Sequence, residues 1–376
     1  MLIAGPERMP GRPNRRMTTL AAGLFVALAL VTGAGAQERP VPEGWVALEA
    51  GDASKAAAIF RDALERNPRS AELHYGAAFA AHLLGRTDAA ISSLKQSIDC
   101  NPRFVPALVL LAQLAYETTD LDLAIRSLER AAALLPRNAQ IARQLEQWRG
   151  EAAVHNQLNE RPGVRFSVLF DGPTVKPIAD HIAGVLEAAY WRIGKTLDSY
   201  PSQTLSVVLY SNQQFFDITR APAWAGGGYD GRIRLPVGGA LRSPADFDRV
   251  VAHEFTHAVI ATAAPRGVPT WVDEGIASYL ESPNHAWAQR VLRQAPVFIP
   301  LEQLDGGFGR FDSDLSLIAY AESLVAAQLL FERLSGNVGL FLQTLESGQS
   351  VDQALTTLGV QPEEFKAAWK ARVVRR

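Results

Sequence analysis

This chain has very little cysteine and very little net charge. Its 376 residues include a single cysteine, Cys100, so no disulfide can form within the chain. The 37 Lys and Arg residues nearly balance the 39 Asp and Glu residues, which leaves a formal net charge of −2. Because nucleic-acid binding needs a strong positive field, we expect no nucleic-acid partner. The 48% hydrophobic content is enough for folding on apolar cores alone.

A hydrophobic run long enough to span a membrane is missing from the N-terminus. The apolar run Leu20 to Val31 is shorter than the roughly 20 residues of a spanning helix. It follows several arginines and ends in Ala34-Gly35-Ala36, a small-residue cleavage pattern. We therefore predict a signal peptide over residues 1–36, with an uncleaved anchor as the alternative. Export and low cysteine content indicate a bacterial periplasm, with no stable membrane span after cleavage.

The N-terminal half repeats itself. Prolines recur with a period of 34 residues, and small or large apolar residues recur at the same spacing. The matching positions are Pro68, Pro102 and Pro136; Ala56, Ala90 and Ala124; Phe60, Leu94 and Leu128; and Ala63, Ser97 and Ala131. This period resembles that of tetratricopeptide repeats, paired helices that stack into a solenoid. We expect an all-α solenoid over residues 37–155, including a capping helix over 139–154.

The resemblance leaves two roles for these repeats. Their groove can bind a protein partner or an extended peptide, or the repeats can brace the second half of the chain. The polar segment 156–163, with Pro162-Gly163, is the expected linker. Each half has enough apolar periodicity for a core of its own, so we expect each to fold alone.

Residues 164–376 predict an α+β domain. Alternating apolar residues favour strands over 164–170 and 204–210, on either side of a helix over 177–197. A glycine-rich turn then leads into a short strand over 233–237. Pro236 indicates an edge position for this strand, although an ordinary hairpin explains the pattern equally well.

The segment His253-Glu254-Phe255-Thr256-His257 carries the strongest chemical signal. On a helix, His253 and His257 lie one turn apart on the same face, so both can bind one metal ion. Glu254 lies beside them as the general base that activates water. A catalytic zinc needs a third protein ligand. Glu274 is the candidate, on a second helix that follows the turn over 264–269.

These motifs resemble the gluzincin metallopeptidases, and within them the peptidase MA-like group. The resemblance covers residues 164–376 and rests on the two histidines with Glu254 and on the segment from Trp271 to Tyr279. It implies a zincin-like fold, one Zn²⁺ per chain bound by His253, His257 and Glu274, and Glu254 as catalytic base. It also implies that an edge strand over 233–237 pairs with the substrate backbone.

One position departs from the family pattern. Thermolysin-like members carry an acidic residue where this chain has Ser278, so support for a zinc-binding histidine must come from elsewhere. Asp273 could supply it, but the spacing of Thr270 and Asp273 favours a helix-capping box. Glu281 we expect in solvent. Tyr320 is a candidate hydrogen-bond donor to the oxyanion, with half-buried packing as the alternative.

The sequence as a whole predicts an exported zinc metallopeptidase. It would hydrolyse peptide bonds through water activated by Glu254, with the repeats as an adaptor for a partner or substrate. The alternative is a non-catalytic periplasmic scaffold whose zincin-like domain is structural or inactive. Against this alternative, a structural metal site has no need of Glu254.

Overall fold

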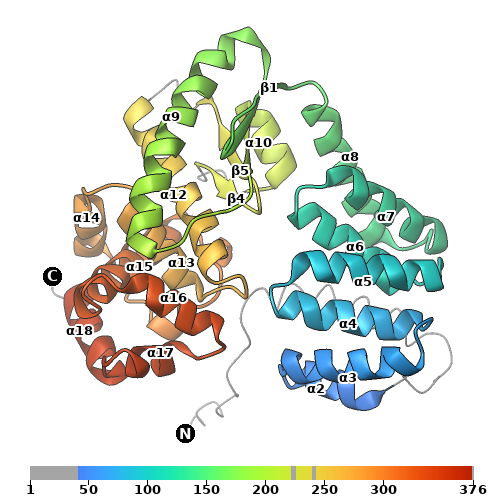
Figure 1. Ribbon diagram of the computed structural model, residues 1–376. Coiled ribbons are helices and arrows are strands. Elements are labelled where there is room, and N and C mark those ends of the chain that lie inside the picture. The colour runs from blue at the N-terminus through green and yellow to red at the C-terminus, as the bar shows by residue number, and fades with distance from the viewer. Residues whose placement is uncertain (1–40, 222–225, 239–242, 375–376) are drawn as a thin grey trace, which may run out of the picture.

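The computed structural model describes residues 41–221, 226–238 and 243–374. It has a helical solenoid, from blue to green in Figure 1, beside a mixed domain with a small sheet. This arrangement confirms the predicted fold class. The signal peptide predicted over residues 1–36 lies outside the described residues.

The solenoid consists of three helix pairs and a final helix. The elements are α2 (Pro42–Glu49), α3 (Ala53–Arg66), α4 (Ala71–Leu83), α5 (Thr87–Cys100), α6 (Val105–Glu117), α7 (Leu121–Leu134) and α8 (Ala139–His155). The residues that recur every 34 positions on α3, α5 and α7 are all buried, so the period marks the face that packs on the neighbouring helices.

Each helix pair turns through one residue with left-handed backbone. Gly51 and Gly85 hold this position in the first two pairs, with φ of 78° and 71°. Thr119 holds it in the third, with φ of 68°. A β-branched residue is strained in this region, because its side chain crowds the backbone.

The second half contains a five-stranded sheet with the order β1-β2-β3-β5-β4. Its strands are β1 (Asn159–Arg161), β2 (Phe166–Phe170), β3 (Leu205–Tyr210), β4 (Gly228–Tyr229) and β5 (Ile233–Pro236). Strands β2, β3 and β5 are parallel, and β1 and β4 pair antiparallel at the two edges. The segment 156–163, expected to be a linker, therefore contributes β1 to the sheet.

The predicted edge position of the strand over 233–237 is wrong. β5 lies between β3 and β4, with Ile233 and Arg234 paired on both sides and all four of its residues buried. The edge strand is β4, which the sequence hides because it has two residues and is rich in glycine. Pro236 fits inside the sheet because the ladder of β4 ends at Arg234.

Helices cover both faces of the sheet. On one face, Val168, Val207 and Leu235 pack in a core with α9 (Gly172–Leu197) and α12 (Pro244–Ala263). On the other, Val208 and Tyr210 pack with α10 (Asn212–Thr219) and with Val154 and Leu158 at the end of the repeats. The last helix of the repeats therefore helps to cover the second face of the sheet.

The remaining helices complete the core around α12. They are α13 (Thr270–Leu280), α14 (Ala286–Gln294), α15 (Ser313–Arg333), α16 (Val338–Glu346), α17 (Val351–Thr357) and α18 (Pro362–Val374), with short 3₁₀ turns at Leu301–Gln303 and Phe308–Arg310. Among the described residues, α15 alone is long and apolar enough to cross a membrane. Its apolar window is 67% buried within the fold, as in a core helix.

A buried ionic cluster joins the repeats to the sheet. Glu151 on α8 is 0% exposed, and its Oε1 accepts hydrogen bonds from Arg232 at 3.2 Å and Arg234 at 2.8 Å. Arg234 also donates to the hydroxyl of Tyr210, at 2.7 Å. The same hydroxyl is hydrogen-bonded to Nε2 of His155, also at 2.7 Å.

This environment keeps His155 neutral. Burial lowers the pKa of its imidazole from 6.5 to about 4, although Glu151 acts in the opposite direction. Between these two values the unfolded chain binds the proton and the folded chain does not. The stability that is present above pH 6.5 is therefore lost as the pH falls towards 4.

We predict that His155→Gln flattens the dependence of stability on pH between about 6.5 and 4. Glutamine can accept the hydrogen bond from Tyr210 but does not titrate in this range. At most about 3 kcal/mol of the acid destabilisation should disappear. Urea unfolding of both proteins across this pH range provides the measurement. Parallel pH curves for the two proteins would contradict the assignment.

Candidate metal centre

Helix α12 places the three motif residues on one face. Ser243 precedes its first turn, and the apolar residues Val251, Phe255 and Val259 anchor it in the core. His253 and His257 follow each other one turn apart, with ring centroids 4.9 Å from each other. Glu254 lies beside them and is buried.

Helix α13 brings Glu274 to the two histidines. Its Oε2 lies 3.3 Å from Nε2 of His253 and 3.5 Å from Nε2 of His257. One donor atom from each of the three residues lies within 4.8 Å of the other two. Ligands bound at about 2.0–2.1 Å around a tetrahedral zinc lie about 3.3–3.4 Å from each other. The oxygen of Glu274 lies at this spacing from both nitrogens, and two imidazoles with a carboxylate are ligands that zinc takes.

The outer nitrogens of both imidazoles are held by carboxylates. Nδ1 of His257 donates to Asp273 at 2.7 Å, and Nδ1 of His253 donates to Glu281 at 2.9 Å. These contacts leave Nε2 of each ring directed at Glu274. Such partners fix the tautomer and the orientation of a metal-binding imidazole.

Two expectations from the sequence are therefore wrong. Helix α13 begins after Pro269 without a side-chain cap, and Thr270 instead donates to the carbonyl of Asp305. Asp273 contacts His257 rather than capping the helix. Glu281 is not in solvent, because its side chain is 9% exposed and also pairs with Arg249 at 3.3 Å.

A signal for Glu281 was present in the sequence. Positions seven apart on a helix lie on one face, so Glu281 follows Glu274 along the face that meets α12. Ser278, four positions after Glu274, is buried, while the hydrogen bonds of the two imidazoles go to Asp273, Glu274 and Glu281. The carboxylate that supports His253 thus comes from one turn farther along the chain than in the family pattern.

The charges in the site shift one another strongly. Burial lowers the pKa of His253, but the carboxylates of Glu274 and Glu281 outweigh this and raise it to about 9. Burial acts on His257 in the same way, and Asp273 and Glu274 raise its pKa well above the usual value. A metal-binding imidazole is neutral, so a bound metal takes the place of these protons.

The two carboxylates in the site are affected in opposite directions. Burial would raise the pKa of Glu274, but the two imidazoles lower it far below its usual value. Burial also raises the pKa of Glu254, and here the imidazoles offset it only in part. Glu274 therefore stays ionised, as a metal ligand must, while Glu254 is the group whose proton affinity is increased.

The site opens into a cleft of about 370 Å³. Beside the motif residues, the residues that line this cleft include Gly227, Gly228, Tyr229, Ile260, Ala264 and Val268. Gly227 lies directly over Glu254: a Cβ on this glycine would be 2.8 Å from Oε1 of the carboxylate. Glycine is what allows the chain to pass so close to this carboxylate.

Tyr320, the candidate oxyanion donor, lines the same cleft. Its ring centroid is 6.4 Å from that of His253 and 5.2 Å from that of Phe308, against which it packs edge-on. The position near His253 is compatible with a role in catalysis, and the contact with Phe308 is compatible with half-buried packing. A role for its hydroxyl in catalysis stays a prediction.

Comparisons with known proteins agree with the two halves of the fold. A family model described as the Peptidase MA superfamily matches residues 187–375. A model described as a tetratricopeptide repeat matches residues 41–103. No curated protein matches the chain.

We predict that Glu281 contributes to metal affinity. Glu281→Ala should weaken zinc binding by about 10–100-fold, because Nδ1 of His253 loses its acceptor, while Glu281→Gln should have a smaller effect because its amide oxygen can still accept. Competition with a chromophoric chelator measures the affinity. Asp248→Asn is the matched control, since Asp248 contacts the exposed His181 at 2.7 Å. Equal affinities for all four proteins would contradict the prediction.

Proposed function

The chain belongs to the Peptidase MA superfamily, and from this premise we propose that it is a zinc-dependent peptidase with an attached tetratricopeptide array. One zinc ion would be held by His253, His257 and Glu274. The observation that carries the proposal is the separation of their donor atoms, 3.3 and 3.5 Å, which suits a tetrahedral zinc. When bound, zinc would act as a Lewis acid that lowers the pKa of water towards neutral pH.

Glu254 is the residue that moves protons. Its carboxylate adjoins the ligands and faces the cleft. It removes a proton from the water that attacks the peptide carbonyl and later delivers a proton to the leaving amine. The raised pKa of Glu254 suits both steps, because a general base works best with a proton affinity near the working pH. This buried base also argues against the alternative of an inactive scaffold.

The edge strand β4 is the surface for the substrate backbone. Gly228 and Tyr229 line the cleft, and among the described strands β4 is paired with β5 alone. An extended peptide can add to the other side as a further strand, which positions its carbonyl without selecting side chains. Tyr320, on the opposite element α15, is the proposed donor to the developing oxyanion.

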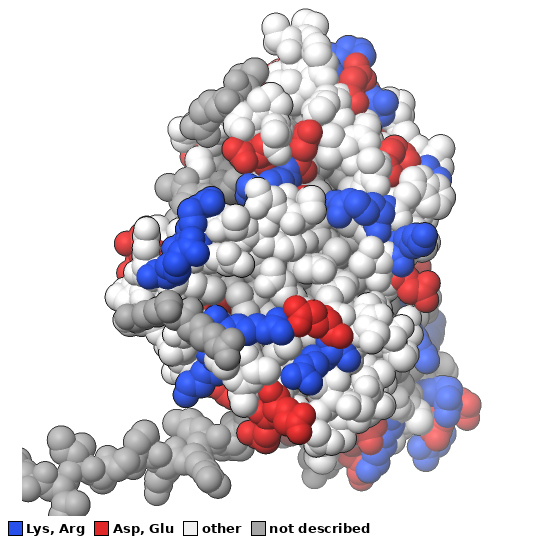
Figure 2. Space-filling view, turned by 90° about the vertical axis from the view of Figure 1, so that its left-hand side faces the viewer, with Lys and Arg blue, Asp and Glu red and all other residues white. Residues whose placement is uncertain are grey.

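The repeats and the location of the protein complete the proposal. The solenoid is proposed as an adaptor that binds a protein partner or substrate in its groove. Export to a bacterial periplasm rests on the N-terminal sequence pattern. Nucleic acid is not a proposed partner, since Lys and Arg are interspersed with Asp and Glu on the face shown in Figure 2.

Substitutions at the site should separate the base from the ligands. Glu254→Gln should keep one zinc per chain but lower peptide hydrolysis on the order of 100-fold or more, because the amide cannot accept the proton. His253→Ala, His257→Ala and Glu274→Ala should each lower the zinc content. Elemental analysis and cleavage of a peptide library, with and without chelator, provide the measurements. A Glu254→Gln protein with full activity would rule out this base.

Gly227 offers a second test of the base. In Gly227→Ala the new methyl group meets Oε1 of Glu254 at 2.8 Å and Cγ1 of Val250 at 2.9 Å, so the carboxylate must move. We expect kcat to fall about tenfold or more with zinc content unchanged. Gly228→Ala is the matched variant, since its Cβ meets nothing within 4 Å, and its loss of kcat should be smaller. A larger loss of kcat in Gly228→Ala than in Gly227→Ala would contradict the proposal that Gly227 makes room for the catalytic carboxylate of Glu254.

A further inference from the structure

Two arginines, Arg232 just before β5 and Arg234 within it, depend on the repeats for their charge balance. Arg232 and Arg234 flank Ile233, so they face away from the core formed with α9 and α12. They are 3% and 2% exposed. The buried carboxylate that faces both belongs to Glu151 on α8, outside the matched peptidase region.

Arg234 has a partner for each of its donor nitrogens. Nε donates to Asp230, Nη1 to the hydroxyl of Tyr210 and Nη2 to both Glu151 and the hydroxyl of Tyr116. The hydroxyl of Tyr116, on α6, in turn donates to Oε2 of Glu151 at 2.8 Å. Burial opposes the positive charge of Arg234, but Asp230 and Glu151 outweigh it and raise its pKa. The guanidinium is thus held in place by two helices of the repeats.

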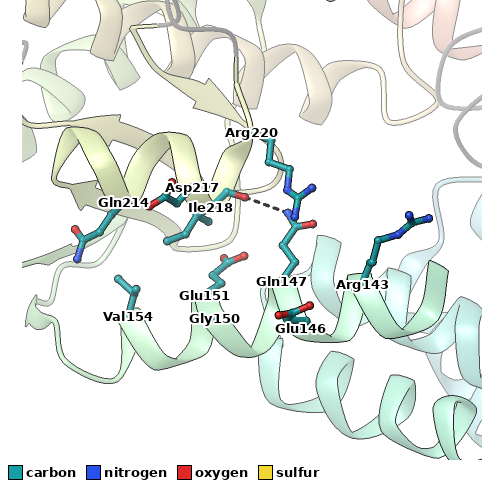
Figure 3. A pocket seen from close by; sticks show the side chains of 10 residues that line it. All are labelled: Arg143, Glu146, Gln147, Gly150, Glu151, Val154, Gln214, Asp217, Ile218 and Arg220. Atoms are coloured by element: carbon teal, nitrogen blue, oxygen red, sulfur yellow. Dashed lines mark hydrogen bonds between the residues drawn. The ribbon is translucent and has the colours of Figure 1, made fainter. Parts of the chain in front are cut away.

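The crevice between α8 and α10 shows how closely the two halves meet. Figure 3 shows Glu151 pointing from α8 towards the sheet domain, with Gln147 donating from the same helix to the carbonyl of Ile218 at 3.0 Å. At the other end of the contact, a Cβ on Gly231, in the β4–β5 turn, would be 2.4 Å from the carbonyl oxygen of Glu117. The repeats therefore touch β5 and the turn that leads to it.

A short series of contacts connects this cluster with the cleft. Glu151 holds Arg232 and Arg234; Ile233 and Arg234 pair with Tyr229 and Gly228 of β4. The chain just before β4 passes over Glu254 at Gly227. A shift of β5 must therefore change the position of the cleft edge, whereas the candidate ligands on α12 and α13 are held by contacts with one another and with Asp273 and Glu281.

We propose that Glu151 is a positioning residue for the peptidase cleft, through which the repeats complete the substrate-binding edge β4. The functional part rests on the peptidase activity proposed above. Without Glu151, Arg234 keeps one carboxylate, Asp230, whose side chain is 43% exposed, and Arg232 keeps none among the described residues. An uncompensated buried charge is strongly unfavourable, so β5 and β4 loosen. The C-terminal half alone, expected above to fold by itself, would have the same defect.

Hydrogen exchange tests the positioning without using activity. In the full chain, Glu151→Gln should speed amide exchange in β4 and β5 on the order of tenfold or more, with exchange in α12 and zinc content unchanged. Glu146→Gln is the matched control, because Glu146 lies on the same helix and is exposed. A folded Glu151→Gln protein with wild-type exchange in β4 and β5 would overturn the proposal.

Kinetics test the consequence for the substrate. With a quenched-fluorescence decapeptide that the wild-type chain cleaves, Glu151→Gln should raise KM about tenfold and leave kcat within about threefold, since the base and ligands stay in place. Faster exchange with an unchanged KM would overturn the role of β4 as the substrate edge. If the wild-type chain cleaves no peptide, the proposed function fails, and the exchange experiment still decides whether Glu151 positions the strand.

Charge balance can be restored by a second substitution. Glu151→Gln with Arg232→Gln leaves Arg234 facing Asp230, so exchange and KM should return to within about threefold of wild type. A double variant as impaired as the single one would contradict the explanation that unbalanced charge loosens the strands.

If Glu151→Gln fails to fold, Tyr116→Phe provides the test instead. This substitution removes one hydrogen bond to Glu151 and keeps the ring stacked on Trp148 at 4.6 Å. Its exchange should rise in β4 and β5, and an unchanged rate would overturn the proposal.

Discussion

The contact between the imidazoles of α12 and the carboxylates of α13 is the constraint on which the site depends. Three acidic residues of one short segment, Asp273, Glu274 and Glu281, meet two histidines inside the fold. Such charges are tolerated in a buried place only when each has a partner. The packing of α13 must therefore be fixed to a fraction of an ångström, and the surrounding elements supply that.

Helix α15 and the loop before it hold α13 in position. Gly275 lies so close to α15 that a Cβ would be 2.3 Å from the carbonyl oxygen of Ser323. At its first turn, the backbone N–H of Trp271 donates to the carbonyl of Leu304, and the indole is buried. A glycine that permits close approach and a large aromatic anchor thus set the depth and the angle of the helix. The metal ligands inherit their geometry from this packing.

The two halves of the chain are less independent than their separate cores indicate. The repeats and the peptidase domain each have a large apolar cluster. A third, small cluster around Tyr210 lies where the end of α8 covers the sheet. Beside it, Glu151 compensates Arg232 and Arg234. The repeats therefore form a solenoid whose last helix also covers one face of the neighbouring sheet, which fits the bracing role that the sequence left open.

Short-range spacing in the sequence determined much of this protein. Residues four apart on a helix share a face, so His253 and His257 could be assigned to one site, with Glu254 beside them. A period of 34 residues predicted the repeats and their buried positions. The order of strands and helices predicted the fold class. Edge and interior strands were not distinguished, because the two residues of β4 carry no period.

Only the tertiary structure decided which charges compensate one another. Asp273 and Glu281 have ordinary local interpretations as a cap and a solvated residue, and their contacts with the histidines arise from the packing of α13 on α12. Glu151 and Arg234 are 83 positions apart and come from different domains. Helical and strand periods reflect the nearest neighbours along the chain. Pairing of buried charges depends on which elements meet in space, and that is settled when the whole fold is packed.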